Sequence, residues 1–128
     1  MKVRSINIIG VAGLMVLSVF LIGDMIAPEP QSVLKEEVFL PQAAELNNRG
    51  VALYKHGSVR EALSHFIIAS EMDHTFWQGH YNCAVALIAL GNPAEAMDHL
   101  KMSIEIDPEN TISQRLYQEL FWKVEVIA

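Results

Sequence analysis

The stretch LGNPAEAMDHLKMSIEIDPEN (residues 90–110) decides the fold, because a second version of it, HGSVREALSHFIIASEMDHTF, stands at residues 56–76. The matched positions lie 34 residues apart, and glycine, glutamate, alanine, histidine and aspartate keep their register. A fixed period of this length indicates stacked helical units, none of which buries its apolar face alone. The matched pairs are Gly57 and Gly91, Glu61 and Glu95, Ala62 and Ala96, His65 and His99, Phe66 and Leu100, Glu71 and Glu105, and Asp73 and Asp107.

Both copies contain residues that end one helix and begin the next. Gly57 and Gly91 are expected between helices, where a residue that tolerates positive φ satisfies the carboxyl end of a helix. Pro93 is expected at the first position of a helix, and Asp107 with Pro108 ends that helix. The predicted N-cap and capping-box pairs are Asn92 with Glu95 and Ser58 with Glu61.

Residues 43–76 and 77–110 resemble two tetratricopeptide repeats, a 34-residue helix-turn-helix family. Small and apolar residues stand at the signature positions of both repeats, whereas Arg49 and His74 depart from the family pattern. The small residues let paired helices approach closely, which supports the same fold on physical grounds. The resemblance implies a right-handed solenoid that binds peptides or proteins. The signature positions are Gly50, Ala62 and Phe66 in the first repeat, and Ala84, Ala96, Leu100 and Pro108 in the second.

The resemblance also implies where a partner binds, namely on the concave face made by the first helix of each repeat. Asn48 and Asn82 occupy matched positions there, and either side chain could bond a peptide backbone. The residues carried over to this face are Asn47, Asn48, Val51, Tyr54, Lys55, Gln78, Tyr81, Asn82, Val85 and Ile88.

Residues 111–128 have helical spacing but lack the small residues of a further repeat. One apolar stripe, Ile112, Leu116, Leu120, Val124 and Ile127, predicts a helix that caps the second repeat. A second apolar surface has two interpretations: it completes a small irregular core, or it contacts a partner, since aromatic residues are enriched in interfaces. This second surface consists of Tyr117, Phe121, Trp122 and Val126.

The composition of the amino-terminal residues predicts a membrane segment. Residues 6–23 contain 18 positions without a charge, which as a helix span about 27 Å of a hydrocarbon core about 30 Å thick. Lys2 and Arg4 precede this run, and acidic residues follow it. This asymmetry predicts a cytoplasmic amino terminus and an extracytoplasmic domain, periplasmic in a bacterium.

A cleaved secretory signal and a retained signal anchor both fit this segment. The small-x-small pattern of a cleavage site is poorly supplied, because Met25 stands at the minus-three position and Pro28 follows Ala27. The apolar run is also longer than that of a usual signal. We therefore expect a retained anchor.

Residues 27–42 contain three of the five prolines, which predicts a tether between membrane and domain. Its central part, SVLKEEVFL (residues 32–40), is too apolar for a free linker, so it forms a helical turn or a strip of chain packed on the domain. Lys2, Arg4 and Asp24 give the first 24 residues a net charge of +1. The remaining residues carry a net charge of −7, which makes the total of −6. An acidic domain argues against binding nucleic acid or lying flat on anionic lipid.

No motif for catalysis stands out. The chain lacks a glycine-rich phosphate loop, a GxSxG elbow and an HExxH helix. Cys83, the single cysteine, falls where the family places a packed apolar residue, which favours a structural thiol. Five histidines suggest a metal-dependent enzyme as one hypothesis, but they lack cysteine or carboxylate partners at ligand spacing, which favours solvated or partly buried side chains. These histidines are His56, His65, His74, His80 and His99.

The sequence thus predicts an all-α protein without catalytic, metal-binding or cofactor-binding residues. Its expected function is a non-enzymatic scaffold or accessory subunit of a larger membrane protein complex, or alternatively an assembly factor that binds client proteins transiently. A histidine-dependent metalloenzyme is a further alternative. The predicted organisation is a membrane anchor at 1–26, a tether at 27–42, repeats at 43–76 and 77–110, and a capping helix at 111–128.

Overall fold

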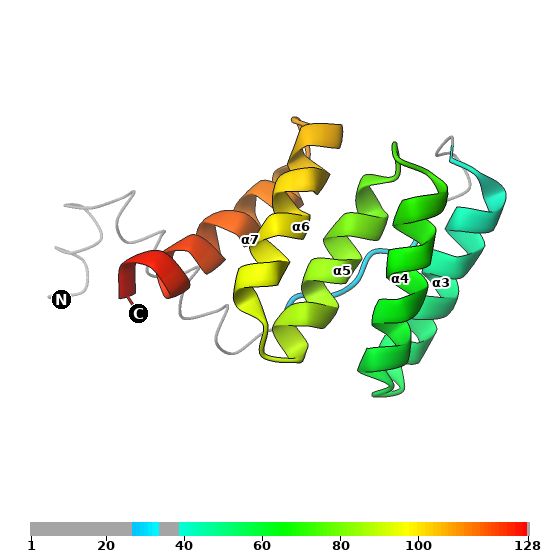
Figure 1. The fold of residues 1–128 in the computed structure, drawn as a ribbon, viewed down its shortest axis with the longest axis horizontal. Coiled ribbons are helices and arrows are strands. Elements are labelled where there is room, and N and C mark those ends of the chain that lie inside the picture. The colour runs from blue at the N-terminus through cyan, green and yellow to red at the C-terminus, as the bar shows by residue number, and fades with distance from the viewer. Residues whose placement is uncertain (1–26, 34–38, 128) are drawn as a thin grey trace, which may run out of the picture.

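The computed structural model describes residues 27–33 and 39–127, and all the regular structure in these ranges is helical. Two helix pairs stand side by side, and one further helix packs against the second pair (Figure 1). This arrangement confirms the prediction of an all-α, repeat-like domain. The elements are α3 (Pro41–Lys55), α4 (Val59–Met72), α5 (Trp77–Ala89), α6 (Pro93–Ile106), α7 (Thr111–Phe121) and a terminal π-helical segment, η1 (Trp122–Ile127).

The predicted membrane anchor at residues 6–23 lies outside the described residues. Among the helices that the structure describes, none has the length and apolarity needed to cross a membrane.

The two inter-helix turns match the sequence prediction. Gly57 has a φ of 87° and Gly91 a φ of 82°, both in the region that favours glycine. In each turn the residue after the glycine reaches back five residues: the N–H of Ser58 donates to the Leu53 carbonyl at 2.9 Å, and that of Asn92 to the Leu87 carbonyl at 2.8 Å. These bonds satisfy the carboxyl ends of α3 and α5.

The predicted capping boxes are wrong, although α6 begins at Pro93 as expected. Within the described chain, the side chains of Ser58 and Asn92 accept no hydrogen bond from the helices that they precede. Their ψ angles of 61° and 65° fall short of the extended region from which an N-cap side chain reaches the first turn. The side chain that does cap a helix is Asn110, which accepts from the N–H groups of Ile112 and Ser113 at the start of α7.

Small residues let the helices of each pair approach closely, as predicted. A Cβ atom on Gly50 would lie 2.5 Å from Cε1 of Phe66, whose side chain is fully buried between α3 and α4. Ala84 occupies the corresponding place in the second repeat, where Leu100 replaces the phenylalanine. The two repeats therefore fill the same space with different pairs of side chains.

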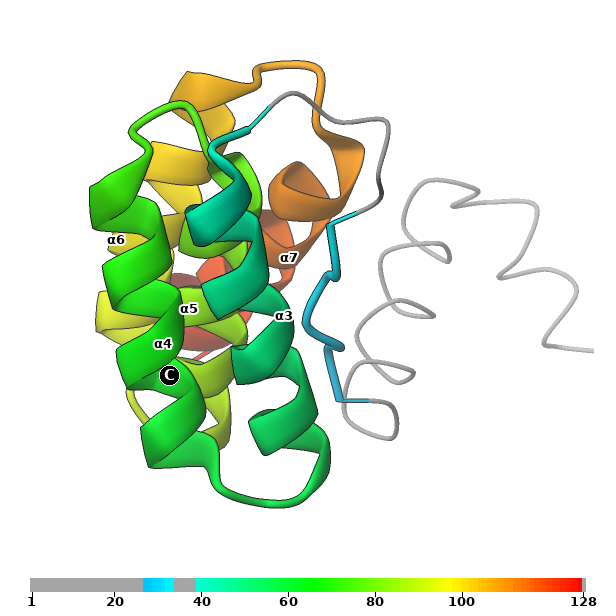
Figure 2. The same cartoon turned by 90° about the vertical axis from the view of Figure 1, so that its right-hand side faces the viewer.

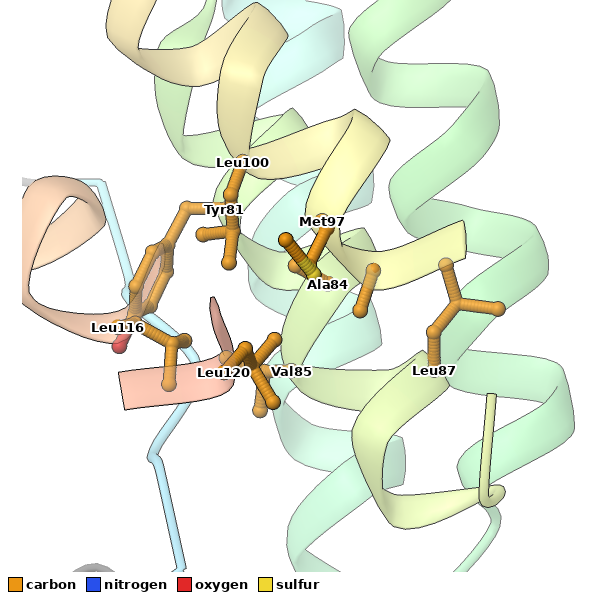
Figure 3. Packing of buried hydrophobic residues seen from close by; sticks show 9 residues of the cluster. Tyr81, Ala84, Val85, Leu87, Met97, Leu100, Leu116 and Leu120 are labelled. Atoms are coloured by element: carbon orange, nitrogen blue, oxygen red, sulfur yellow. The ribbon is translucent and has the colours of Figure 1, made fainter. Parts of the chain in front are cut away.

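Helix α7 covers the second repeat, which confirms the predicted capping role. Leu116 and Leu120 are buried and pack against Tyr81 and Val85 of α5 (Figure 3). Ile112 and Val124 lie partly buried against the same cluster.

The first helix of the first repeat begins before the predicted repeat boundary at residue 43. Helix α3 starts at Pro41, inside the segment assigned to the tether, because proline suits the first position of a helix.

Candidate functional site: the concave face

The concave face holds an extended piece of the protein's own chain, residues 27–33, here called the strap. The strap lies alongside α3 (Figure 2) and bonds to side chains of both α3 and α5. It runs antiparallel to α3, because Val33 bonds to Asn48 whereas Glu29 acts electrostatically on Tyr54, farther along the helix. The structure thus places part of the predicted tether on the concave face, the predicted partner-binding surface, which is also called the groove below.

The backbone of Gln31 is the centre of this contact. Its N–H donates to Oδ1 of Asn82 at 2.5 Å, and its carbonyl accepts from Nδ2 of Asn82 at 2.7 Å. Nδ2 of Asn47 donates to the same carbonyl at 2.9 Å. Both backbone polar groups of one residue, Gln31, are therefore held by side-chain amides, with Asn47 from the first repeat and Asn82 from the second.

The two asparagines are fully buried and bonded to each other, with Nδ2 of Asn82 donating to Oδ1 of Asn47 at 2.6 Å. Buried amides need partners, and leaving one unbonded costs about 1–3 kcal/mol. An extended backbone provides the missing donor and acceptor. The concave face is therefore built to hold extended chain.

Other strap residues are held differently. Pro30 is buried, Ser32 is exposed, and the N–H of Val33 donates to Oδ1 of the exposed Asn48 at 2.9 Å. The hydrogen bonds to α3 and α5 use strap backbone atoms, so they do not depend on the side chains at positions 31 and 32. Because Pro30 is buried, position 30 favours an apolar side chain.

The last residue of the strap and Phe39, which follows the strap in the chain, also pack on the domain. Val33 and Phe39 lie against a cluster formed by Ala43, Ala69 and Phe76, with the rings of Phe39 and Phe76 centred 4.8 Å apart. This packing confirms that part of the segment assigned to the tether is a strip of chain on the domain. The apolar residues at 33 and 39 were the available sequence signal, whereas nothing in the sequence indicated that Gln31 would enter the groove.

The residues predicted for the concave face divide by exposure. Asn82 and Asn48 both bond peptide backbone, and that backbone belongs to the same chain. Val85 is fully buried against α7, and Ile88 packs partly against the same cluster, so α7 covers them. A role for the ten residues in binding a separate partner stays a prediction. Buried are Asn47, Val51, Gln78, Tyr81, Asn82 and Val85; half-buried are Tyr54 and Ile88; exposed are Asn48 and Lys55.

Two tyrosines lie near the strap. Burial raises the pKa of Tyr81 to about 12, and burial together with the Glu29 carboxylate raises the pKa of Tyr54. Both hydroxyls therefore stay protonated at neutral pH and remain hydrogen-bond donors.

The second apolar surface splits between its two interpretations. Tyr117 packs partly buried against the core of the second repeat, which favours the interpretation that it completes the core. Phe121 and Trp122 remain 39% and 44% exposed, with their rings edge to face at 6.3 Å. The side chain of Val126 lies outside the described residues.

The histidines do not gather into a cluster. His80 and His99 approach with their Nδ1 atoms 3.3 Å apart. Among the residues that the structure describes, no group of three or more histidine, cysteine or acidic side chains is arranged to hold a metal ion. Burial first, and the charges of His99 and His74 second, lower the pKa of His80 to about 4.

Cys83 is a packed thiol. It is fully buried in the cluster around Phe66, and burial raises its pKa to about 12. The thiolate, which is the nucleophilic form, is therefore scarce at neutral pH.

The comparisons with known proteins agree with the helical pattern. Residues 77–110 match the family model described as tetratricopeptide repeat, and these are the boundaries predicted for the second repeat. A search among curated proteins returned no match to the chain. The chain is therefore similar to tetratricopeptide-repeat proteins across α5 and α6, and its described part has a helical, repeat-like architecture.

Proposed function

We propose that the protein is a non-enzymatic scaffold that holds a protein partner at a membrane. The observation that supports this function is the concave face, where buried amides from two repeats bond both backbone polar groups of one residue, Gln31. Such a contact suits recognition of backbone and performs no chemistry. The similarity of residues 77–110 to tetratricopeptide repeats points to the same class of function.

Membrane attachment is the second part of the proposal. The uncharged run at residues 6–23 supports it, and the basic residues before that run support an extracytoplasmic domain. The strap begins at residue 27, so three residues separate it from the predicted anchor. Four residue steps reach at most about 14 Å, which holds the domain close to the bilayer surface.

Crosslinking in intact cells followed by gentle detergent purification tests the scaffold function. A permanent subunit is expected to be recovered with its partners in fixed proportion, and recovery of the protein alone would contradict the proposal. Trp122→Ala should weaken recovery if the exposed pair Phe121 and Trp122 contacts the partner. Met102→Ala is the matched control, because Met102 is a large apolar residue with the same 44% exposure on a different helix.

A second candidate function is that of an assembly factor with transient clients. The occupied groove favours it, because a site already filled by the strap weakens the binding of any competing segment. Substoichiometric recovery of several clients, in place of one partner in fixed proportion, would identify this function.

A further inference from the structure

We infer that the strap is a resident peptide, and that the partner presents an extended segment of the same kind that replaces it. This inference rests on the proposed interaction function and names the class of ligand: extended chain with a proline, followed by a residue that has a free N–H. The strap residues that define this class are Pro30 and Gln31.

The concave face bonds the backbone of the strap and not its side chains. Gln31 is held at its N–H by Asn82 and at its carbonyl by Asn82 and Asn47, and these bonds leave its side chain unread. Any residue except proline can supply the same donor and acceptor. A foreign segment can therefore make the same bonds.

Few residues of the strap are in close contact with the concave face. Pro30 is the buried residue of the strap, whereas Ala27, Glu29 and Ser32 are exposed. The bond from Val33 to Asn48 lies at an exposed edge. The bonds to buried side chains are thus concentrated at Gln31, next to the buried Pro30, and Val33 adds a partly buried apolar contact; a partner segment can match these features.

Loss of the strap removes hydrogen bonds from the concave face. Asn47 and Asn82 are fully buried with the strap in place. On its loss they keep the bond between themselves and the 3.4 Å bond from Nδ2 of Asn47 to Oδ1 of Asn48, and lose the three bonds to Gln31. Buried polar groups in native proteins are bonded. Replacement of one extended segment by another therefore suits this site better than an open groove.

The strap also has the advantage of attachment. A segment tethered to its own site has an effective concentration on the order of millimolar. A free peptide of the same sequence competes with it poorly, so the wild-type protein should bind such a peptide weakly. A change that weakens the strap should reveal the site.

The test uses the full-length protein in detergent and a fluorescent, end-blocked peptide of residues 27–33, APEPQSV, with binding followed by fluorescence anisotropy. The variant is Gln31→Pro, which removes the N–H that donates to Asn82 and leaves the groove itself unchanged. We expect the variant to bind the peptide at least tenfold more tightly than the wild type. Ser32→Ala, a change at the neighbouring exposed position, should bind like the wild type.

A control peptide carries proline in place of Gln31 and should not bind the Gln31→Pro protein. Equal binding of the two peptides, or equal binding to wild type and variant, would overturn the inference. If circular dichroism shows that Gln31→Pro has lost helix, Val33→Pro decides instead. It removes the edge bond to Asn48 and the Val33 side chain that packs beside Phe76, leaves the bonds of Gln31 in place, and should raise peptide affinity about threefold. An unchanged affinity in that variant would also overturn the inference.

Three further outcomes are informative. Concentration-dependent dimers of the wild type that Gln31→Pro abolishes would mean that the strap is exchanged between copies, which contradicts a resident peptide within one chain. If peptide exchange fails while the crosslinking experiment still recovers a partner, the inference is wrong and the scaffold function stands. If exchange succeeds and no partner is recovered, the groove is as inferred and the proposed scaffold function is wrong.

Discussion

At the residue scale, the two repeats solve one packing problem in two ways. Gly50 faces Phe66 in the first repeat, whereas Ala84 and Leu100 occupy the matched positions in the second. A larger residue on one helix is accompanied by a smaller one on the other, because interiors pack at nearly constant density. The pairs should therefore be interchangeable as pairs but not as single residues.

We expect Gly50→Ala to lower the free energy of unfolding by about 1–3 kcal/mol, since the new methyl group would overlap the ring of Phe66. The double variant Gly50→Ala with Phe66→Leu recreates the pair of the second repeat. It should be more stable than the sum of its single changes predicts. Urea unfolding of the full-length protein, followed by circular dichroism, measures both effects, and strict additivity would contradict this account.

The His80 and His99 pair makes stability depend on pH. Burial is the main cause that lowers the pKa of both rings, that of His80 to about 4 from an ordinary value of 6.5. A folded pKa below the unfolded one means that the unfolded chain binds protons more readily, so stability is complete above about pH 6.5 and falls between pH 6.5 and about 4. We expect a loss of about 1 kcal/mol from His80, a discounted figure because both rings are partly exposed to solvent.

Thermal unfolding of wild type and His80→Gln at pH 7.5 and 5.0 measures this dependence, which should be smaller in the variant. His65→Gln is the matched control. His65 occupies the repeat position of His99, but its Nδ1 lies 2.9 Å from the Glu61 backbone carbonyl oxygen of its own helix. An equal reduction of the pH dependence in both variants would contradict the role assigned to the pair.

At the scale of the element, α7 completes the second repeat in place of a third repeat. Its apolar stripe could be predicted from spacing alone, and Leu116 and Leu120 are buried as that stripe requires. The capping residues could not be predicted as well. Asn110 caps α7, whereas Asn92 does not cap α6. The two residues have the same side chain but different backbone angles, and the sequence does not show that difference.

Leu116→Ala should destabilise the protein by about 2–4 kcal/mol, because it removes an α7 side chain that is buried in the cluster with Tyr81 and Val85 of α5. Phe121→Ala, on the same helix but 39% exposed, should cost less than about 1 kcal/mol. Urea denaturation distinguishes the two. Equal losses would mean that α7 does not dock through its predicted stripe.

At the scale of the whole molecule, the period of 34 residues predicted the helix pairs, the turns and the order of the elements. It could not predict the strap, because the strap has no periodic pattern and its hydrogen bonds to the groove use backbone atoms. The apolar composition of residues 32–40 indicated packing on the domain without indicating where. Contacts made by backbone leave little trace in a sequence, and the candidate site consists largely of such contacts.

The predicted topology belongs to this scale as well. With a retained anchor and a cytoplasmic amino terminus, protease added outside spheroplasts should cleave a tag fused after Ala128 and leave a tag before Met1 intact. The opposite pattern would contradict the orientation, and release of the protein without detergent would contradict the anchor. An alkaline phosphatase fusion at Ala128 gives an independent readout.

Because the strap is hydrogen-bonded to the domain, it can transmit force, which a flexible linker would not do. If residues 6–23 span the bilayer, a force on the membrane helix passes through three residues to Ala27 and then to the hydrogen bonds of Gln31. An axial shift of the helix by one turn, about 5.4 Å, exceeds the length of any of these bonds and would pull the segment out of register. Tension at the membrane and occupancy of the groove would then be linked, so that movement of the anchor would alter binding at the concave face.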